Sequence, residues 1–185
     1  MPTENERKYV LINEPFVLNE IAKRAKKILS IEQVYIQSGK GWNFRVRKTF
    51  GIHYDDPVYH ATYKHKVGGR VIEIQTKLDE RDYKDLSKQT ISAIVHKTRY
   101  VIPIGSLKWE IDFFYIARKT EPYFVLAEIE LPEGVARPPS VPNFISDHLI
   151  LAVPEDDNRF TSKKLADMAY AIKRYDELIE GLSNE

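Results

Sequence analysis

The sequence predicts an α+β fold in which antiparallel strands carry charged side chains on one face and apolar side chains on the other. Two observations lead to this prediction. Charged residues recur at every second position in several segments rich in β-branched and aromatic residues, and successive side chains of a strand point to opposite faces. Segments 16–29 and 161–182 space their apolar residues as amphipathic helices do.

The composition is that of one ordinary globular domain, and we expect residues 1–185 to form a single unit. The chain is 43% hydrophobic and 30% charged, and its net charge of +1 provides no overall field that would attract anions. Any affinity for anions must therefore come from local clusters of cations. The absence of cysteine excludes disulfides, thiolate metal sites and a cysteine nucleophile. A charged N-terminus and the lack of a long apolar run predict a cytoplasmic protein without a signal peptide or a membrane partner.

The first half of the chain is expected to form strands around one helix. Glu14-Pro15 ends the first strand, helix 16–29 follows, and turns at 38–41 and 68–69 suggest two hairpins. The expected strands are 4–12, 33–37, 42–48, 59–67 and 71–78. The residues that share the charged face of these strands are Glu4, Glu6, Lys8, Arg45, Arg47, Thr62, Lys64, Glu73 and Gln75.

The second half shows the strongest alternation. A helix is expected over 79–95, and two later strands place acidic residues opposite large apolar ones. These pairs are Glu110 and Asp112 against Trp109, Ile111 and Phe113, and Glu128 and Glu130 against Ala127, Ile129 and Leu131. The proline-rich segment 132–142 is expected to cross the surface as a connection, and helix 161–182 closes the chain.

Two arrangements satisfy this alternation. A single-layer sheet would leave the carboxylates in water, whereas a closed barrel with its apolar faces against outer helices would bring carboxylates and cations together in its interior. Such an interior is too polar to be dry, so it would require water, a metal or a charged ligand.

Six charged motifs, in their order along the chain, resemble those of the CYTH superfamily, also called triphosphate tunnel metalloenzymes. The motifs are Glu4-x-Glu6-x-Lys8, Arg45-x-Arg47, Thr62-x-Lys64, Lys97-x-Arg99, Glu110-x-Asp112 and Glu128-x-Glu130. The resemblance runs from residue 4 to about residue 165. It implies a closed antiparallel β-barrel of about eight strands that forms a polar tunnel, with amphipathic helices outside. Members include inorganic, thiamine and RNA 5′-triphosphatases and class IV adenylyl cyclases.

The resemblance also implies roles for individual residues. The metal ligands would be Glu4, Glu6, Glu110, Asp112, Glu128 and Glu130, and the phosphate ligands Lys8, Arg45, Arg47, Lys64 and Arg99, with Lys97 beside them. Arg159 and Lys163 are further candidates for phosphate contact, because segment 153–163 resembles the part of the family that precedes its last helix. The expected catalytic residues are Glu4, Glu6, Lys8, Lys97 and Glu130. Carboxylates favour hard cations such as Mg²⁺ or Mn²⁺, and arginine matches phosphate oxygens in pairs.

The function expected from these residues is metal-dependent hydrolysis of a triphosphate, with inorganic triphosphate favoured because the sequence shows no element that would read a base. A cyclase that makes 3′,5′-cyclic AMP from ATP remains an alternative, as does a non-catalytic binder of a phosphorylated metabolite. Ala152 and Pro154 stand where many members carry an acidic residue and a threonine, and Gln75 lies near the position where a second glutamate often follows Glu73. These departures keep the binder open as an alternative to hydrolysis. No sequence-specific nucleic-acid partner is expected.

Overall fold

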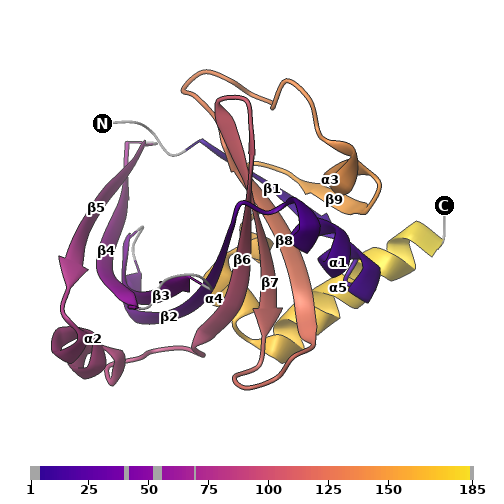
Figure 1. The fold of residues 1–185 in the computed structure, drawn as a ribbon. Helices are drawn as coiled ribbons and strands as arrows, with labels where there is room; N and C mark the ends of the chain where they lie inside the picture. Colours follow the sequence, from indigo (N-terminus) through magenta and orange to yellow (C-terminus); the bar gives the residue numbers. More distant parts are fainter. Residues whose placement is uncertain (1–4, 40–41, 52–55, 69, 184–185) are drawn as a thin grey trace.

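The computed structural model describes residues 5–39, 42–51, 56–68 and 70–183 (Figure 1). Its strands form one antiparallel sheet in the order β5-β4-β3-β2-β6-β7-β8-β1-β9. The strands are β1 Glu6–Leu11, β2 Lys27–Gly39, β3 Trp42–Gly51, β4 Val58–Val67, β5 Arg70–Leu78, β6 Val95–Ile104, β7 Leu107–Tyr115, β8 Pro122–Glu130 and β9 Leu149–Val153. The helices are α1 Pro15–Arg24, α2 Glu80–Ser87, α3 Asn143–Ser146, the 3₁₀ helix η1 Asn158–Phe160, α4 Ser162–Leu165 and α5 Met168–Ser183.

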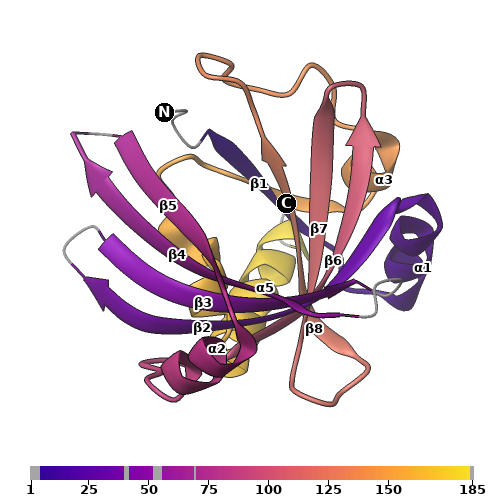
Figure 2. The same cartoon turned by 60° about the vertical axis from the view of Figure 1, so that its left-hand side comes forward.

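The sheet curls into a cup that stays open between its two edge strands. Figures 1 and 2 show the half made of β2–β5 facing the half that contains β6, β7, β8 and β1. β5 and β9 end the strand order and do not pair with each other, so the expected closed barrel of about eight strands is not confirmed. β9 has only five residues, and η1 and α4 pack inside the curve.

The convex face of the sheet carries most of the apolar core. Trp109, Phe113 and Ile129 are buried there against Val17 and Ile21 of α1. A second cluster forms where α2 packs on β2, β3 and β4. Helices outside the sheet are thus confirmed for α1 and α2, and the apolar positions of the alternating strands point toward them.

The concave face is apolar at one end and charged at the other. Phe124 and Leu126 precede Glu128 on β8 at every second position, so all three side chains point to the concave face. Phe160 and Leu165 pack on this apolar end, and the ring centroids of Phe124 and Phe160 lie 6.1 Å apart. The C-terminal segment therefore fills one end of the cup and leaves the charged end open.

Several expected element boundaries are wrong. Helix α1 ends at Arg24 rather than 29, because Ala25 has extended backbone angles and the chain continues into β2. Helix α2 ends at Ser87 rather than 95. The expected helix 161–182 is two helices, and Asp167 accepts a hydrogen bond from Tyr170 N (3.1 Å) at the start of the second. β9 was not expected, since its sequence LILAV does not alternate.

No helix within the described part of the chain is both long and apolar enough to cross a membrane.

Replacing Phe160 by alanine tests whether the C-terminal segment is part of the core. Phe160 is 1% exposed, so we expect Phe160→Ala to lower the free energy of unfolding by about 3–5 kcal/mol, measured by urea denaturation. Leu182→Ala is the control, because Leu182 is 52% exposed on α5 and its truncation should cost about 0.5 kcal/mol or less. Equal losses in the two variants would contradict this packing.

Candidate functional site

A cavity of about 380 Å³ opens at the charged end of the concave face. Six cationic side chains and four carboxylates line it, an excess of two positive charges. The lining residues are Glu6, Lys8, Tyr35, Arg45, Arg47, Lys64, Glu73, Lys97, Arg99, Glu128, Glu130, Thr161 and Ser162. They come from seven strands and from the start of α4, so sheet curvature brings together residues that are far apart in sequence.

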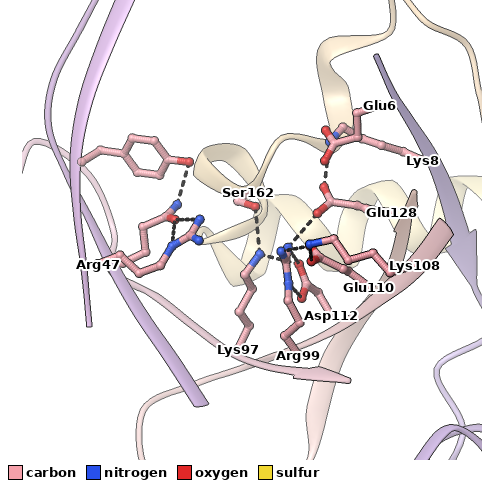
Figure 3. A network of polar contacts seen from close by, with 12 residues as sticks. Glu6, Lys8, Arg47, Lys97, Arg99, Lys108, Glu110, Asp112, Glu128 and Ser162 are labelled. Carbon is pink, nitrogen blue, oxygen red and sulfur yellow. Dashed lines mark hydrogen bonds and ion pairs between the residues drawn. The ribbon is translucent and has the colours of Figure 1, made fainter. Parts of the chain in front are cut away.

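Arg99 holds together the acidic wall, which we define as the carboxylates of β1, β7 and β8 on the concave face (Figure 3). Its Nε lies 2.7 Å from Asp112 Oδ1 and its Nη2 lies 2.8 Å from Glu128 Oε2, and Nη1 also contacts Glu110. Burial disfavours the charged guanidinium, but Asp112, Glu128 and Glu110 outweigh it and raise the pKa of Arg99. The three carboxylates therefore share one permanent cation.

Two lysines complete the neutralisation of this wall. Lys8 Nζ contacts Glu6 and lies 2.7 Å from Glu128 Oε1. Burial alone would raise the pKa of Glu128, yet Lys8, Lys97 and Arg99 hold it well below its usual range. The pKa of Lys8 is raised because Glu128 and Glu6 outweigh the opposing effect of its burial. At neutral pH both Lys8 and Glu128 are therefore ionised.

Lys97 occupies the floor of the cavity. Its Nζ contacts Asp112, lies 3.4 Å from Ser162 Oγ, and sits 5.4 Å from the ring centroid of Phe114. Burial and the neighbouring Arg99 lower its pKa to about 8, against the opposing effect of Asp112. Lys97 is thus a cation whose charge changes just above neutral pH.

The opposite side of the cavity forms the basic wall, which we define as Arg45, Arg47 and Lys64. Arg47 donates from Nε and Nη2 to Gln33 Oε1 at 3.0 and 2.8 Å, and Gln33 Nε2 donates to the Tyr35 hydroxyl at 2.9 Å. Burial and the nearby Arg45 and Arg99 lower the pKa of Arg47 to about 10.

Arg45 is the least satisfied cation of this wall. Its Nε is buried and has no hydrogen-bond partner within the described residues. Lys64, by contrast, forms an ion pair in which its Nζ lies 2.9 Å from Glu73 Oε2. A buried donor without a partner costs free energy, so Arg45 favours an anion in the cavity.

The structure brings most of the sequence-predicted site residues together. Lys8, Glu6, Arg45, Arg47, Lys64, Lys97, Arg99, Glu128 and Glu130 line the cavity, and Glu110 and Asp112 lie directly behind Arg99. Glu4 lies outside the described residues.

Arg159 and Lys163 are not brought into the cavity. Arg159 pairs with Asp157 (2.7 Å) with 46% of its side chain exposed, and neither residue is among those that line the cavity. Ala152 is also displaced from it, because it pairs with Tyr9 on the outward-facing side of β1. Its departure from the family pattern therefore does not alter the cavity wall.

Sequence reasoning missed Gln33, Tyr35 and Ser162. Gln33 is fully buried and orients Arg47, and Tyr35 holds Gln33. The alternation Gln33-x-Tyr35 lies directly across the hairpin from Arg45-x-Arg47, and this cross-strand pairing could have identified them.

A hard divalent ion fits the donor chemistry of Glu6, Glu128 and Glu130, since all three supply carboxylate oxygens. Within the described residues, however, no group of three or more acidic or histidine side chains is arranged to hold a metal ion. Lys8 lies between Glu6 and Glu128. Metal binding there would require Lys8 to release at least one of these carboxylates.

The lowered pKa of Lys97 predicts a rise in stability at alkaline pH. Below about pH 8 both the native and the unfolded state hold the proton. Between about 8 and the ordinary value of 10.5 only the unfolded state holds it, so the free energy of unfolding increases with pH. Relative to Lys97→Met, we expect a gain of at most about 3 kcal/mol from pH 7 to 10.5, measured by urea denaturation. Parallel pH profiles for the two proteins would show that Lys97 does not titrate in this range.

Comparisons with known proteins show that the fold of this chain is similar to that of several solved structures. No protein-family model and no curated protein matches the chain. Among solved structures, the inorganic triphosphatase NE1496 is 22% identical with a TM-score of 0.52, and the match covers 90% of this chain and 95% of that one. A second structure of NE1496, described as a hypothetical protein, is 24% identical with a TM-score of 0.53, over 89% and 97% of the two chains. The PH1012 protein of Pyrococcus horikoshii OT3 is 20% identical with a TM-score of 0.50, over 72% and 80%. Identity at this level establishes architecture rather than activity. The chain therefore shares the fold of the inorganic triphosphatase NE1496, in agreement with the likeness of its charged motifs to the CYTH superfamily.

Proposed function

We propose that the concave cavity binds a triphosphate-containing substrate and hydrolyses it with a divalent metal ion. The observation that carries this proposal is the basic wall, where Arg45 and Arg47 stand side by side and the buried Arg45 Nε has no partner within the described residues. Two adjacent guanidinium groups without a carboxylate between them are costly unless an anion joins them. Phosphate oxygens suit this role, because guanidinium groups bind them in pairs.

The opposition of two walls favours an extended polyanion over a single phosphate. The acidic wall is neutralised by Arg99 and Lys8, and Figure 3 shows Arg47 of the basic wall on the opposite side of the cavity. Arg45 and Lys64, from β3 and β4, line the same cavity. A chain of phosphates could contact Arg45, Arg47 and Lys64 at one side and Lys8 and Lys97 at the other. Charge-assisted contacts of this kind orient a substrate as well as bind it.

Inorganic triphosphate is the favoured substrate because the cavity offers no surface for a base. Tyr35 is the one aromatic side chain among the described residues that line it, and its hydroxyl is occupied by Gln33. The likeness of fold to an inorganic triphosphatase is consistent with this choice.

The residues of the chain would divide the work of hydrolysis between binding and charge control. Arg45, Arg47 and Lys64 would hold the substrate, and Lys97 would stabilise negative charge that develops on its phosphoryl oxygens. Glu6, Glu128 and Glu130 would hold Mg²⁺ or Mn²⁺, which would neutralise phosphate charge and activate water. Lys8 would transfer its contact from these carboxylates to the phosphate chain.

A non-catalytic binder is the second candidate, and the ion pairs of the acidic wall favour it. Glu128 is committed to both Lys8 and Arg99, so its oxygens bind a metal only if these pairs weaken. Turnover assays with tripolyphosphate, ATP and thiamine triphosphate in Mg²⁺ or Mn²⁺ decide between the two. Stoichiometric binding without any product would support the binder, and cyclic AMP with pyrophosphate from ATP would identify a cyclase.

Removing the basic wall should weaken binding. We expect Arg45→Ala and Arg47→Ala each to reduce the affinity for tripolyphosphate by about 1.5–3 kcal/mol, the size of a charge-assisted hydrogen bond, measured by calorimetry without metal. Arg81→Ala serves as the matched control, since Arg81 is exposed on α2. Unchanged affinity in both wall variants would remove the cavity as the binding site.

Removing one carboxylate should separate catalysis from binding. Glu130 is exposed and accepts a hydrogen bond from Asn5 N at 3.2 Å, so Glu130→Gln should leave the fold intact. We expect Mn²⁺-dependent phosphate release to fall at least about 100-fold, because a hard cation needs the negative charge. Metal-free affinity for tripolyphosphate should stay equal or increase, because a negative charge beside the anion is lost. Glu133→Gln, in the exposed loop beyond β8, is the control, and normal turnover in Glu130→Gln would exclude Glu130 as a metal ligand.

A further inference from the structure

A second cavity, of about 530 Å³, lies on the convex face of the sheet, and Lys97 is the residue that its lining shares with the concave cavity. It crosses β2, β3 and β6 between the parts of this face that α1 and α2 cover. We call it the convex groove and define it by Ser30, Lys48, Phe50, Thr98, Arg118 and Lys119. The register pairs Phe50 with Ser30 and Ser30 with Thr98, so the side chains that line the groove alternate with those that face the cup.

The convex groove has an excess of positive charge. Lys48, Arg118 and Lys119 line it, and none of them forms an ion pair with a carboxylate in the part of the chain that the structure describes. Glu32 is the acidic residue of the lining, and it already accepts a hydrogen bond from the Tyr83 hydroxyl at 2.8 Å. It also lies 3.8 Å from His96 Nδ1. Lys48 lies directly opposite Glu32 in the pairing of β2 with β3, and it also acts electrostatically on the Glu80 carboxylate. Arg118 and Lys119 are exposed, so they are the cations of the groove that are most available to an anion.

Arg118 holds an unfavourable backbone conformation at the rim of this groove. Its φ is +65°, a value rare for residues other than glycine, asparagine and aspartate. The turn is closed by Lys119 N donating to Ile116 O at 3.0 Å, and a residue with positive φ at this third position of a turn is usually glycine. Glycine suits this backbone better than arginine, so the guanidinium can be removed by Arg118→Gly without adding strain.

Apolar and hydroxyl groups accompany the cations. Phe50 is 39% exposed and Ile116 is 43% exposed beside the groove, and Tyr115 is half-buried in its wall. Ser30 and Thr98 offer hydroxyl groups between the aromatic floor and the cationic rim. The combination matches a ligand with one anionic end and one flat apolar end.

We propose that the convex groove binds a phosphate monoester of an aromatic compound, with Arg118, Lys119 and Lys48 on the phosphate and Phe50 against the ring. This site stands whether or not the concave cavity is a triphosphatase. A bound ligand would lie beside Thr98 and His96 of β6, whose neighbouring residues Lys97 and Arg99 line the concave cavity.

The test uses AMP and phenyl phosphate as probes, titrated by calorimetry without metal into the full chain and into its Arg45→Ala/Arg47→Ala double variant. We expect both probes to bind at millimolar concentration or tighter, and adenosine and inorganic phosphate each to bind at least tenfold more weakly. Arg118→Gly should weaken AMP binding at least tenfold without loss of stability, because glycine suits the positive φ. Arg118→Lys should restore part of the affinity, and Lys48→Gln should weaken it as well.

Two controls separate this site from the concave cavity. Lys88→Gln, which changes an exposed lysine of the α2 C-cap outside the groove, should bind AMP normally. Tripolyphosphate affinity should be unchanged in Arg118→Gly. The proposal is overturned if neither probe binds. It is also overturned if the Arg118→Gly/Lys48→Gln double variant still binds AMP while the Arg45→Ala/Arg47→Ala double variant does not.

Discussion

The site depends on how Arg99 and Lys8 neutralise carboxylates that the sheet places directly opposite one another. The register pairs Glu110 with Glu128 across β7 and β8, and Glu6 with Glu130 across β1 and β8. Like charges in directly opposed positions destabilise a sheet, so this arrangement requires cations between them. Arg99 reaches Glu110, Asp112 and Glu128, and Lys8 reaches Glu6 and Glu128. Without these two residues the acidic wall would not be stable.

The two faces of the sheet have different roles, one in stability and one in forming the charged cavity. Its convex face buries apolar residues against α1 and α2, which supplies most of the hydrophobic stabilisation. Its concave face can then carry charge, provided that one end is closed by Phe160, Leu165 and α5. The apolar packing at that end removes water from one side of Lys97, and this burial is the main reason that its pKa is lowered. Apolar packing at the closed end of the cup thus lowers the pKa of Lys97 at the bottom of the cavity.

The strands and their inward-facing residues could be predicted because the alternation of charge has a period of two and strands keep that period over their whole length. Arg45, Arg47, Glu128 and Glu130 illustrate this, since each lines the cavity as expected. The helix ends could not be predicted in the same way. Residues 27–29 fit both a helical and a strand pattern, and only their pairing with β6 places them in a strand.

The relative positions of segments far apart in the chain could not be predicted from the sequence either. Closure of the sheet depends on whether β5 and β9 meet, and no local pattern specifies that distance. The positions of Arg159 and Lys163 depend on how η1 and α4 turn, and the pairing of Arg159 with Asp157 two residues earlier was not anticipated. The roles of Gln33 and Tyr35 likewise emerge only when β2 and β3 are aligned.

The central claim is that the cup binds a triphosphate chain between its two walls and cleaves it. Phosphorus NMR of tripolyphosphate mixed with excess protein tests this most directly, because one spectrum reports both binding and products. Without metal, the account predicts broadened and shifted resonances of intact triphosphate. After addition of Mg²⁺ or Mn²⁺, it predicts their replacement by pyrophosphate and orthophosphate. Sharp, unshifted triphosphate resonances under both conditions would contradict it.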